Sequence, residues 1–297
     1  MLTVLEGPDA LGVLHTPAAT RAVVSWNADA PSGEIALTAH RTDGSVSGPL
    51  PYVRWAPSER RSLDGVDAKT RIAIDVVRSD VPLSGIGVAA SVTLDAVAVS
   101  TPPPPDAHVP ARRRVAALDV TALSQYVGDR PQERGWCSAA SLAMLLRFHG
   151  LDAPVATVAT GVYDSAYGGT GNWAFNVAYA GARGLRAMVA YLHGIDHVAA
   201  FLEAGLPVAI SISWRRAQLP GAPLEASDGH LIVVRGLEPA HVLVNDPAHP
   251  QLSVRYGRAA LDRVFREHGG VAYLIAPRAR TTELVALANA VETAGRR

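Results

Sequence analysis

The only cysteine of the chain, Cys137, stands directly before a segment of strong helix formers. Residues 139–146 are rich in Ala, Leu and Met, and Gly150 is typical of the position just after a helix. A thiol at a helix N-terminus faces unpaired backbone N–H groups and the positive end of the helix dipole. Because both favour the thiolate, Cys137 is predicted to be a catalytic nucleophile.

A thiolate nucleophile needs a histidine beside it and a group that orients that histidine. His230 begins the apolar, strand-like segment 230–236, and Asp246 lies near the end of the next one, 241–247. If these strands are adjacent and antiparallel, Asp246 can accept a hydrogen bond from the ring of His230. The other histidines are interpreted mostly as ordinary surface or core residues.

The competing interpretation of Cys137 is an inert core residue, since buried free cysteine is common. Its position after the polar loop 127–135 and Trp136 is unusual for such a residue. The glycine-rich segment 167–173 lacks the Lys-Ser/Thr ending of a phosphate-binding loop. Its glycines instead allow close approach of a substrate chain, beside Asn172 and Trp173.

Charge and cysteine content exclude several classes of function. The 27 basic and 27 acidic residues balance, so no global field attracts nucleic acid. A single cysteine forms neither an internal disulfide nor a two-cysteine metal motif. His193 and His197 have helical spacing, but Gly194 interrupts it and Asp196 is expected to be an N-cap. No metal and no cofactor are therefore expected.

Two further expectations concern the location of the protein. The first residues have no basic segment followed by an apolar core, so no signal peptide is predicted. No stretch approaches 18 uninterrupted apolar residues, so no membrane span is expected. Together these features predict a cytoplasmic protein.

The N-terminal third is predicted to be an all-β domain, residues 1–100. Its strands are expected at residues 21–26, 34–40, 70–77 and 88–94, separated by turn-forming residues. Short strands without helices indicate a β-sandwich or jelly roll. Trp26, Tyr52 and Trp55 are expected to fill its core, and the alternative is an aromatic platform for a sugar or peptide.

The rest of the chain is predicted to be α+β. Residues 101–114 contain four consecutive prolines and are interpreted as a linker, beside the solvated arginines 112–114. A domain at 115–278 follows, and 279–297 form a helical tail. Strands are expected at 115–123, 208–214, 230–236, 241–247 and 271–275, and helices from 139, at 153–163, 174–182, 197–204 and 258–268.

Four segments in order carry a resemblance to a known family. They read SQY…GWCSAASLAMLLRFHG, GNWAFNVAYAGARG, DGHLIVVRG and VLVNDPAHP. Together they resemble the papain-like cysteine peptidase family C-39 and its C-39-like relatives, which include the peptidases that cut bacteriocin leaders after double glycine. The likeness covers roughly residues 115–277. It is closer to stand-alone members with a preceding β domain than to members fused to transporters.

The resemblance implies a papain-like fold with a catalytic triad of Cys137, His230 and Asp246. It also implies a glutamine that donates to the oxyanion, and Gln125, in its Ser-Gln context, is preferred over Gln132. Ser138 follows the cysteine where the family often has glycine.

The implied substrate is a peptide or protein, and the predicted function is a thiol hydrolase. Asn172, Trp173 and Trp136 are predicted to line its substrate cleft. The alternative is a silent module that binds peptide in the cleft and a glycan or cell-wall ligand on the β domain. The presence of cysteine, histidine, aspartate and glutamine together favours an active enzyme.

Overall fold

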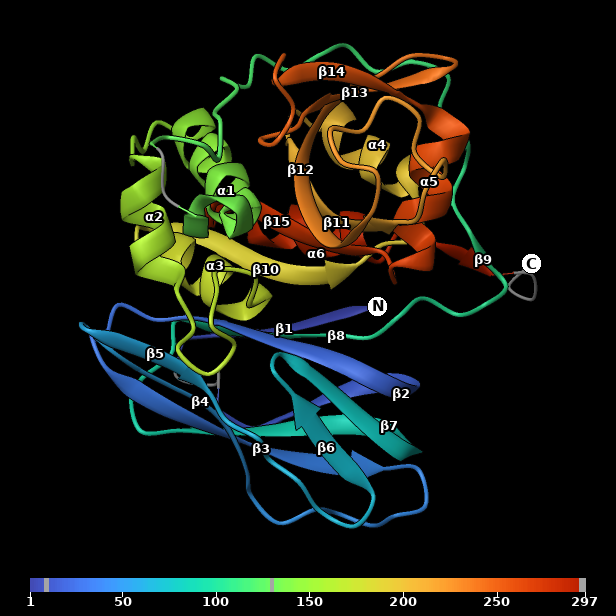
Figure 1. The fold of residues 1–297 in the computed structure, drawn as a ribbon. Helices are drawn as coiled ribbons and strands as arrows, with labels where there is room; N and C mark the ends of the chain where they lie inside the picture. Colours follow the sequence, from blue (N-terminus) through green and yellow to red (C-terminus); the bar gives the residue numbers. More distant parts are fainter. Residues whose placement is uncertain (8–10, 129–130, 294–297) are drawn as a thin grey trace.

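Two antiparallel sheets dominate the computed structural model, which describes residues 1–7, 11–128 and 131–293. Figure 1 shows the sheet of the N-terminal residues below and the second sheet, with its helices, above. Among the described residues, no helix is both long and apolar enough to cross a membrane.

The lower sheet has eight strands in the order β1-β8-β2-β7-β3-β4-β5, and β6 pairs with β7. Every second residue of a strand points to the same face of the sheet, and in β3 the side chains of Ile35, Leu37 and Ala39 on one face are buried. The strands are β1 (Leu2–Glu6), β2 (Val13–Asn27), β3 (Gly33–Arg41), β4 (Leu50–Ala56), β5 (Glu59–Ser62), β6 (Thr70–Ala73), β7 (Val76–Ala90) and β8 (Ala96–Ser100).

Two details of the lower sheet differ from the sequence expectation. The strand expected at 70–77 is broken, because Ile74 has a φ of 61° and turns the chain from β6 into β7. The strand expected at 88–94 is the end of β7, which stops at Ala90. Trp26 and Tyr52 are buried in its core, which confirms the packing interpretation of these aromatic residues.

The upper sheet has the order β10-β15-β11-β12-β13-β14. Its central strands are apolar on both faces because helices cover both. The strands are β10 (Leu185–Tyr191), β11 (Val208–Trp214), β12 (Ser227–Leu237), β13 (His241–Asn245), β14 (Ser253–Gly257) and β15 (Val271–Pro277).

Helices α1 (Cys137–Phe148), α2 (Val155–Val162) and α3 (Trp173–Gly181) cover one face of this sheet. Helices α4 (Ile195–Glu203), α5 (Arg258–Glu267) and α6 (Thr281–Ala288) cover the other. Short 3-10 turns η2 (Pro131–Gly135) and η3 (Arg278–Arg280) precede α1 and α6.

Three expectations for this region need correction. The strand expected at 115–123 forms only a single bridge, between Val115 and Leu237. The N-cap of α4 is Gly194, whose φ of 144° suits glycine, and Asp196 lies in the first helical turn. Of the expected tail helix only Thr281–Ala288 forms, and Glu292–Thr293 (β16) pair with Ala107–His108 (β9). The last residues of the expected tail, 294–297, lie outside the described residues.

The domain boundary expected at residues 101–114 stays a prediction.

Polar side chains of the lower sheet cover the open edge of the upper one. Asn27 Nδ2 donates to the Ala187 carbonyl at 2.9 Å, and Asn27 Oδ1 accepts from the Ala187 amide at 3.1 Å. Ser25 Oγ accepts from Val189 N at 3.1 Å. Because β10 is the edge strand, these bonds satisfy backbone groups that a strand partner would otherwise pair. The two sheets are therefore joined by specific hydrogen bonds.

Candidate active site

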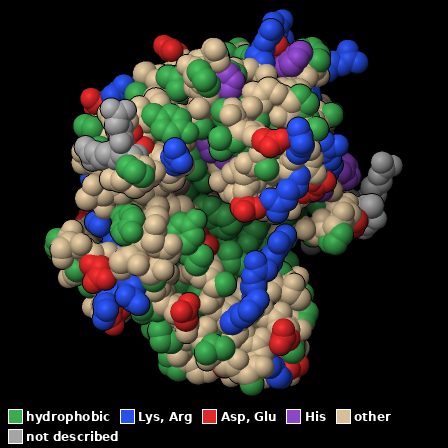
Figure 2. Space-filling model, viewed as in Figure 1, with side chains coloured by type: hydrophobic (Ala, Val, Ile, Leu, Met, Phe, Trp, Pro, Cys, Tyr) green, Lys and Arg blue, Asp and Glu red, His purple; other side chains and the backbone are tan. Residues whose placement is uncertain are grey.

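A cavity of about 650 Å³ lies where α1, β12 and the lower sheet meet. Figure 2 shows this face of the molecule hollowed between its upper and lower halves, with hydrophobic side chains on the floor. Segments distant in sequence form its walls, and they include the turn between β6 and β7, the start of α1, the loop before α3 and the start of β12. Its lining includes Ile74, Asp75, Gln125, Cys137, Tyr167, Trp173 and His230.

Cys137 is the first residue of α1 and lines this cavity. Its helix begins without a side-chain cap, so the first-turn N–H groups face the site. Burial opposes ionisation, but hydrogen bonding and charge interaction with His230 outweigh it and lower the pKa of the Cys137 thiol. Ser138, where the family often has glycine, is buried and shares a 2.8 Å hydrogen bond with the Tyr273 hydroxyl.

His230 is buried in β12, between the thiol and a carboxylate. Its Nε2 lies 2.7 Å from Asp246 Oδ1, which leaves Nδ1 as the ring nitrogen for Cys137. The Trp214 ring packs edge-on against the imidazole, with centroids 5.7 Å apart. Burial opposes the charge on His230, but the hydrogen bonds to Asp246 and Cys137 prevail and raise its pKa. The geometry therefore favours a thiolate beside an imidazolium.

Asp246 directly follows β13, and three donors hold its carboxylate. Oδ1 accepts from His230 and from Ala248 N at 3.0 Å, and Oδ2 accepts from the Tyr256 hydroxyl at 2.7 Å. Burial raises the pKa of this carboxyl, and these hydrogen bonds outweigh it, so the pKa is lowered. The antiparallel pairing of β12 with β13 brings His230 and Asp246 together, as their spacing suggested.

The two candidate glutamines lie in different places. Gln125 is buried and lines the cavity, whereas Gln132 is exposed on η2. The Gln125 Nε2 donates to the carbonyls of Glu133 and Arg134, both at 2.9 Å. Gln125 therefore holds the segment that leads into Cys137.

Of the three predicted substrate contacts, only Trp173 lines the cavity. Trp136 is buried against α1 and belongs to the core. Asn172 is fully buried and is the N-cap of α3, where its Oδ1 accepts from Phe175 N. Its Nδ2 donates to Asp164 Oδ2 at 2.9 Å, so the side chain is committed to structure.

Tyr256 and Asp75 were not predicted from the sequence to belong to the site. Tyr256 lies on β14, and no local pattern indicates that its hydroxyl reaches Asp246. Asp75 lies inside a segment that was predicted to continue as a strand, and only the turn at Ile74 directs it into the cavity. Among the described residues, no group of three His, Cys, Asp or Glu side chains could hold a metal.

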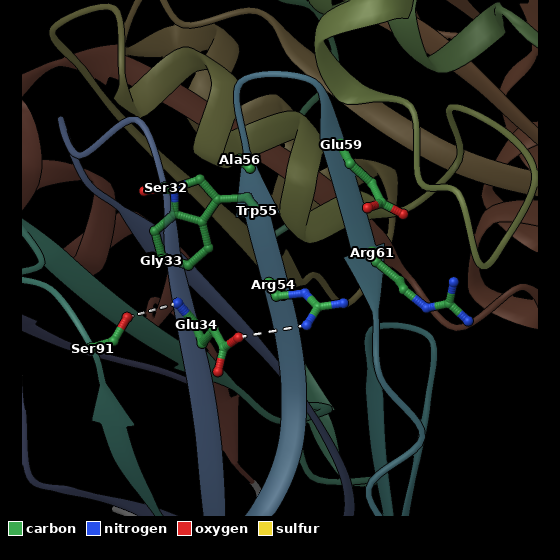
Figure 3. Close-up of a pocket in the computed structure, with 9 residues that line it drawn as sticks. All are labelled: Ser32, Gly33, Glu34, Arg54, Trp55, Ala56, Glu59, Arg61 and Ser91. Carbon is green, nitrogen blue, oxygen red and sulfur yellow. Dashed lines mark hydrogen bonds and ion pairs between the residues drawn. The ribbon is translucent and has the colours of Figure 1, made fainter.

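A second hollow lies on the lower sheet, around Trp55 (Figure 3). The Trp55 ring lies across Gly33 of the neighbouring strand, and a Cβ at Gly33 would come within 2.5 Å of it. Its Nε1 donates to the Ala30 carbonyl, and only 9% of the residue is exposed. Little of the aromatic ring is left for a sugar to stack on, so the alternative of a glycan ligand gains no support and stays a prediction.

The Cys137 thiol and the His230 imidazole line one cavity of a mixed α/β fold, and Asp246 is hydrogen-bonded to the imidazole. The model of the Peptidase_C39 like family matches residues 117–273, more than half of the chain. The chain belongs to this family, which confirms the resemblance seen in its sequence.

Three solved structures are similar to part of the chain at low identity. A Bacillus anthracis protein described as a C39-like peptidase is 17% identical, with a TM-score of 0.43, and covers 56% of this chain and 99% of its own. A double glycine motif protease from an AMS/PCAT transporter, in complex with the leader peptide, is 22% identical, with a TM-score of 0.38 and the same coverage. The peptidase domain of Streptococcus ComA is 18% identical, with a TM-score of 0.37, over 53% of this chain and 98% of its own. No curated protein matches the chain.

Proposed function

We propose that the protein is a cysteine peptidase that cleaves peptide bonds with Cys137, His230 and Asp246. One observation carries this proposal: His230 is hydrogen-bonded to Asp246 at 2.7 Å and lines, with Cys137, a cavity open to solvent, where interaction with His230 lowers the pKa of the thiol. Family membership supports a peptidase-type function and a peptide substrate.

In the proposed reaction the Cys137 thiolate attacks the carbonyl carbon of the scissile bond. The imidazolium of His230 donates its proton to the leaving amine, and the C–N bond breaks to leave an acyl-enzyme. His230 then removes a proton from water, which attacks the thioester and releases the acid and the thiol. Asp246 keeps the imidazole in the tautomer that faces the sulfur.

The negative oxygen of the tetrahedral intermediate needs hydrogen-bond donors. The backbone N–H of Cys137, at the start of α1, is the first proposed donor. Gln125 is the second, as the resemblance implies. Because both of its N–H groups bond to carbonyls in the resting structure, Gln125 must release one of them to act.

The proposal includes the arrangement that the resemblance implies. A helix that carries the cysteine packs on an antiparallel sheet that carries the histidine, as in papain-like enzymes. The lower sheet is proposed to be the separate β domain of the two-domain members. Tyr167 and Leu224, half-exposed at the cavity, offer apolar contact to a peptide chain.

A pool of peptides with varied sequences, incubated with the protein and analysed by mass spectrometry, tests the proposal. We expect cleavage products with wild type and none with Cys137→Ala. Products that persist with Cys137→Ala would contradict the role of Cys137. Retention of uncut peptides by both proteins would instead indicate the silent binding module.

A further inference from the structure

The turn between β6 and β7 brings a part of the lower sheet into the proposed active site. Ile74 and Asp75, at the tip of this turn, line the same cavity as Cys137 and His230. Ile74 has a φ of 61°, a left-handed conformation that is unfavourable for a β-branched side chain. Such strain is found where surrounding contacts hold a residue in a functionally required place.

Asp75 is held deep in the cavity wall, with 5% of the residue exposed. Its Oδ2 accepts from the backbone N–H of Trp173, the first residue of α3, at 2.7 Å. Among the described residues, no Lys or Arg forms an ion pair with it. Arg78, three residues further on, also lines the cavity, but its side chain is exposed and does not pair with Asp75.

The surroundings of Asp75 add negative charge and aromatic surface. Burial, together with the nearby carboxylate of Asp164, outweighs the hydrogen bond from the Trp173 backbone and raises the pKa of Asp75 to about 7. Asp164 is itself fully buried and bonds to Ser62 N at 3.1 Å. Trp173 and Tyr167 line the same wall, and aromatic faces attract cations.

We infer that Asp75 is a substrate-binding residue that holds an ammonium or guanidinium group next to the bond attacked by Cys137. A buried carboxylate without a protein cation gains most from a cation that the substrate supplies. The group would come from a Lys or Arg side chain or from the free amino terminus of a peptide. This inference rests on the proposed function and adds its substrate class.

Alkylation of Cys137 by small reagents of different charge tests the inference without a known substrate. The reagents are 2-bromoethylamine, iodoacetamide and iodoacetate. In each case the sulfur bonds to carbon and the halide ion leaves. The rate of each reagent with Cys137 is divided by the rate of the same reagent with N-acetylcysteine. In wild type we expect the cationic reagent to exceed the anionic one by about 10-fold or more in relative rate, since the charges attract at short range. In Asp75→Asn this ratio should fall at least about fivefold, because Asn keeps the bond from Trp173 but lacks the charge.

Asp228→Asn is the matched control. Asp228 lines the same cavity, but it is exposed and ion-paired with Arg215 at 2.6 Å, so its removal should change the ratio less than about twofold. Asp75→Ser provides a second variant if Asp75→Asn does not fold. Because the imidazolium of His230 also acts on charged reagents, the change caused by replacing Asp75 is decisive, and an unchanged ratio in the Asp75 variants would overturn the inference.

Peptides distinguish the two sources of the cation. Lys-containing peptides are compared with their acetyl-lysine forms, and free with acetylated amino termini. If acetylation of the lysine, or of the amino terminus, lowers cleavage by wild type but not by Asp75→Asn, the acetylated group is the one that Asp75 binds. Equal cleavage of charged and neutral peptides overturns the inference and leaves the proposed peptidase intact. No cleavage of any peptide, with Cys137 no more reactive than N-acetylcysteine, would contradict the proposed function itself.

Discussion

The hydroxyl of Tyr256 donates a hydrogen bond to Asp246 at 2.7 Å, on the carboxylate oxygen that His230 does not use. Tyr256 lies on β14, one strand beyond the strand that leads to Asp246. Since His230 and Tyr256 hold one oxygen each, the carboxylate cannot rotate without losing a bond. Tyr256 is therefore a positioning residue for the proposed triad.

Replacing Tyr256 with Phe should lower kcat/KM for peptide cleavage by about 10-fold, the effect of losing one hydrogen bond to a charged group. Because that bond helps to lower the pKa of Asp246, the acid limb of the pH–rate profile should move to higher pH. Tyr52→Phe, which removes a buried hydroxyl from the lower sheet, is the control and should leave the limb in place. An unchanged limb in Tyr256→Phe would show that Tyr256 is only structural.

The pairing of Cys137 with His230 predicts unusual thiol reactivity at low pH. A free thiol has a pKa of about 8.5, so at pH 6 the wild type, with its lowered pKa, should react with iodoacetamide at least roughly 30-fold faster than His230→Ala. The difference should narrow as the pH rises, because the thiol of His230→Ala then ionises as well. His241→Ala, an exposed histidine of β13, should behave as wild type. Equal and slow labelling of all three proteins would exclude the catalytic role of Cys137.

The Asp246–His230 pair predicts a pH window of stability. The raised pKa of His230 contributes stability that is fully present below its unfolded value of about 6.5 and is lost as the pH rises through the folded value. The lowered pKa of Asp246 contributes stability that is present above about 3.9 and is lost as the pH falls through the folded value. The combined contribution is therefore largest between about pH 4 and 6.5.

Asp246→Asn should weaken the upper side of this dependence. Without the carboxylate the pKa of His230 is raised less, so less stability should be lost as the pH rises above about 6.5. Urea unfolding between pH 4 and 9 measures both proteins. Parallel curves for wild type and Asp246→Asn would show that the pair does not titrate as described.

The bonds from Asn27 to β10 predict a graded loss of stability. Asn27→Ala leaves both backbone groups of Ala187 unpaired and should lower the free energy of unfolding by about 2–4 kcal/mol. Ser25→Ala removes one acceptor, that of Val189 N, and should cost about 1–2 kcal/mol. Urea titrations compare the two. An effect of Asn27→Ala no larger than that of Ser25→Ala would contradict the edge-covering role.

Two neighbouring glycines beside the upper sheet, Gly269 and Gly270, should differ in how much their replacement by Ala destabilises the protein. Gly270 has a φ of +74°, and a Cβ there would lie 2.2 Å from the Leu192 carbonyl oxygen. Gly270→Ala should therefore destabilise the protein by about 3 kcal/mol or more. Gly269 has a φ of +103° but only ordinary contacts, so Gly269→Ala should cost about 1–2 kcal/mol. Thermal unfolding ranks the two, and the opposite order would refute the clash.

Local patterns predicted most of the secondary structure of the second half. The strand β11 was predicted at its observed bounds, and α3 and α5 within one residue at each end. These segments have clear apolar periodicity and glycine or proline beside them. The prediction failed for residues 115–123. Their pattern is typical of a strand, but the segment forms only one isolated bridge, between Val115 and Leu237.

The sequence by itself determined the chemical groups of the site and the order in which they occur. The cysteine could be chosen because it stands before a predicted helix, and the aspartate because it stands at the end of a predicted strand. The histidine was chosen as the start of a predicted strand, although the observed strand β12 begins three residues earlier, at Ser227. Tertiary structure decided what surrounds them. It buried Asn172 and Trp136 as structural residues, and brought Tyr256 to Asp246 and Asp75 to the cavity. These contacts join segments far apart in sequence or on different strands, so no local periodicity encodes them.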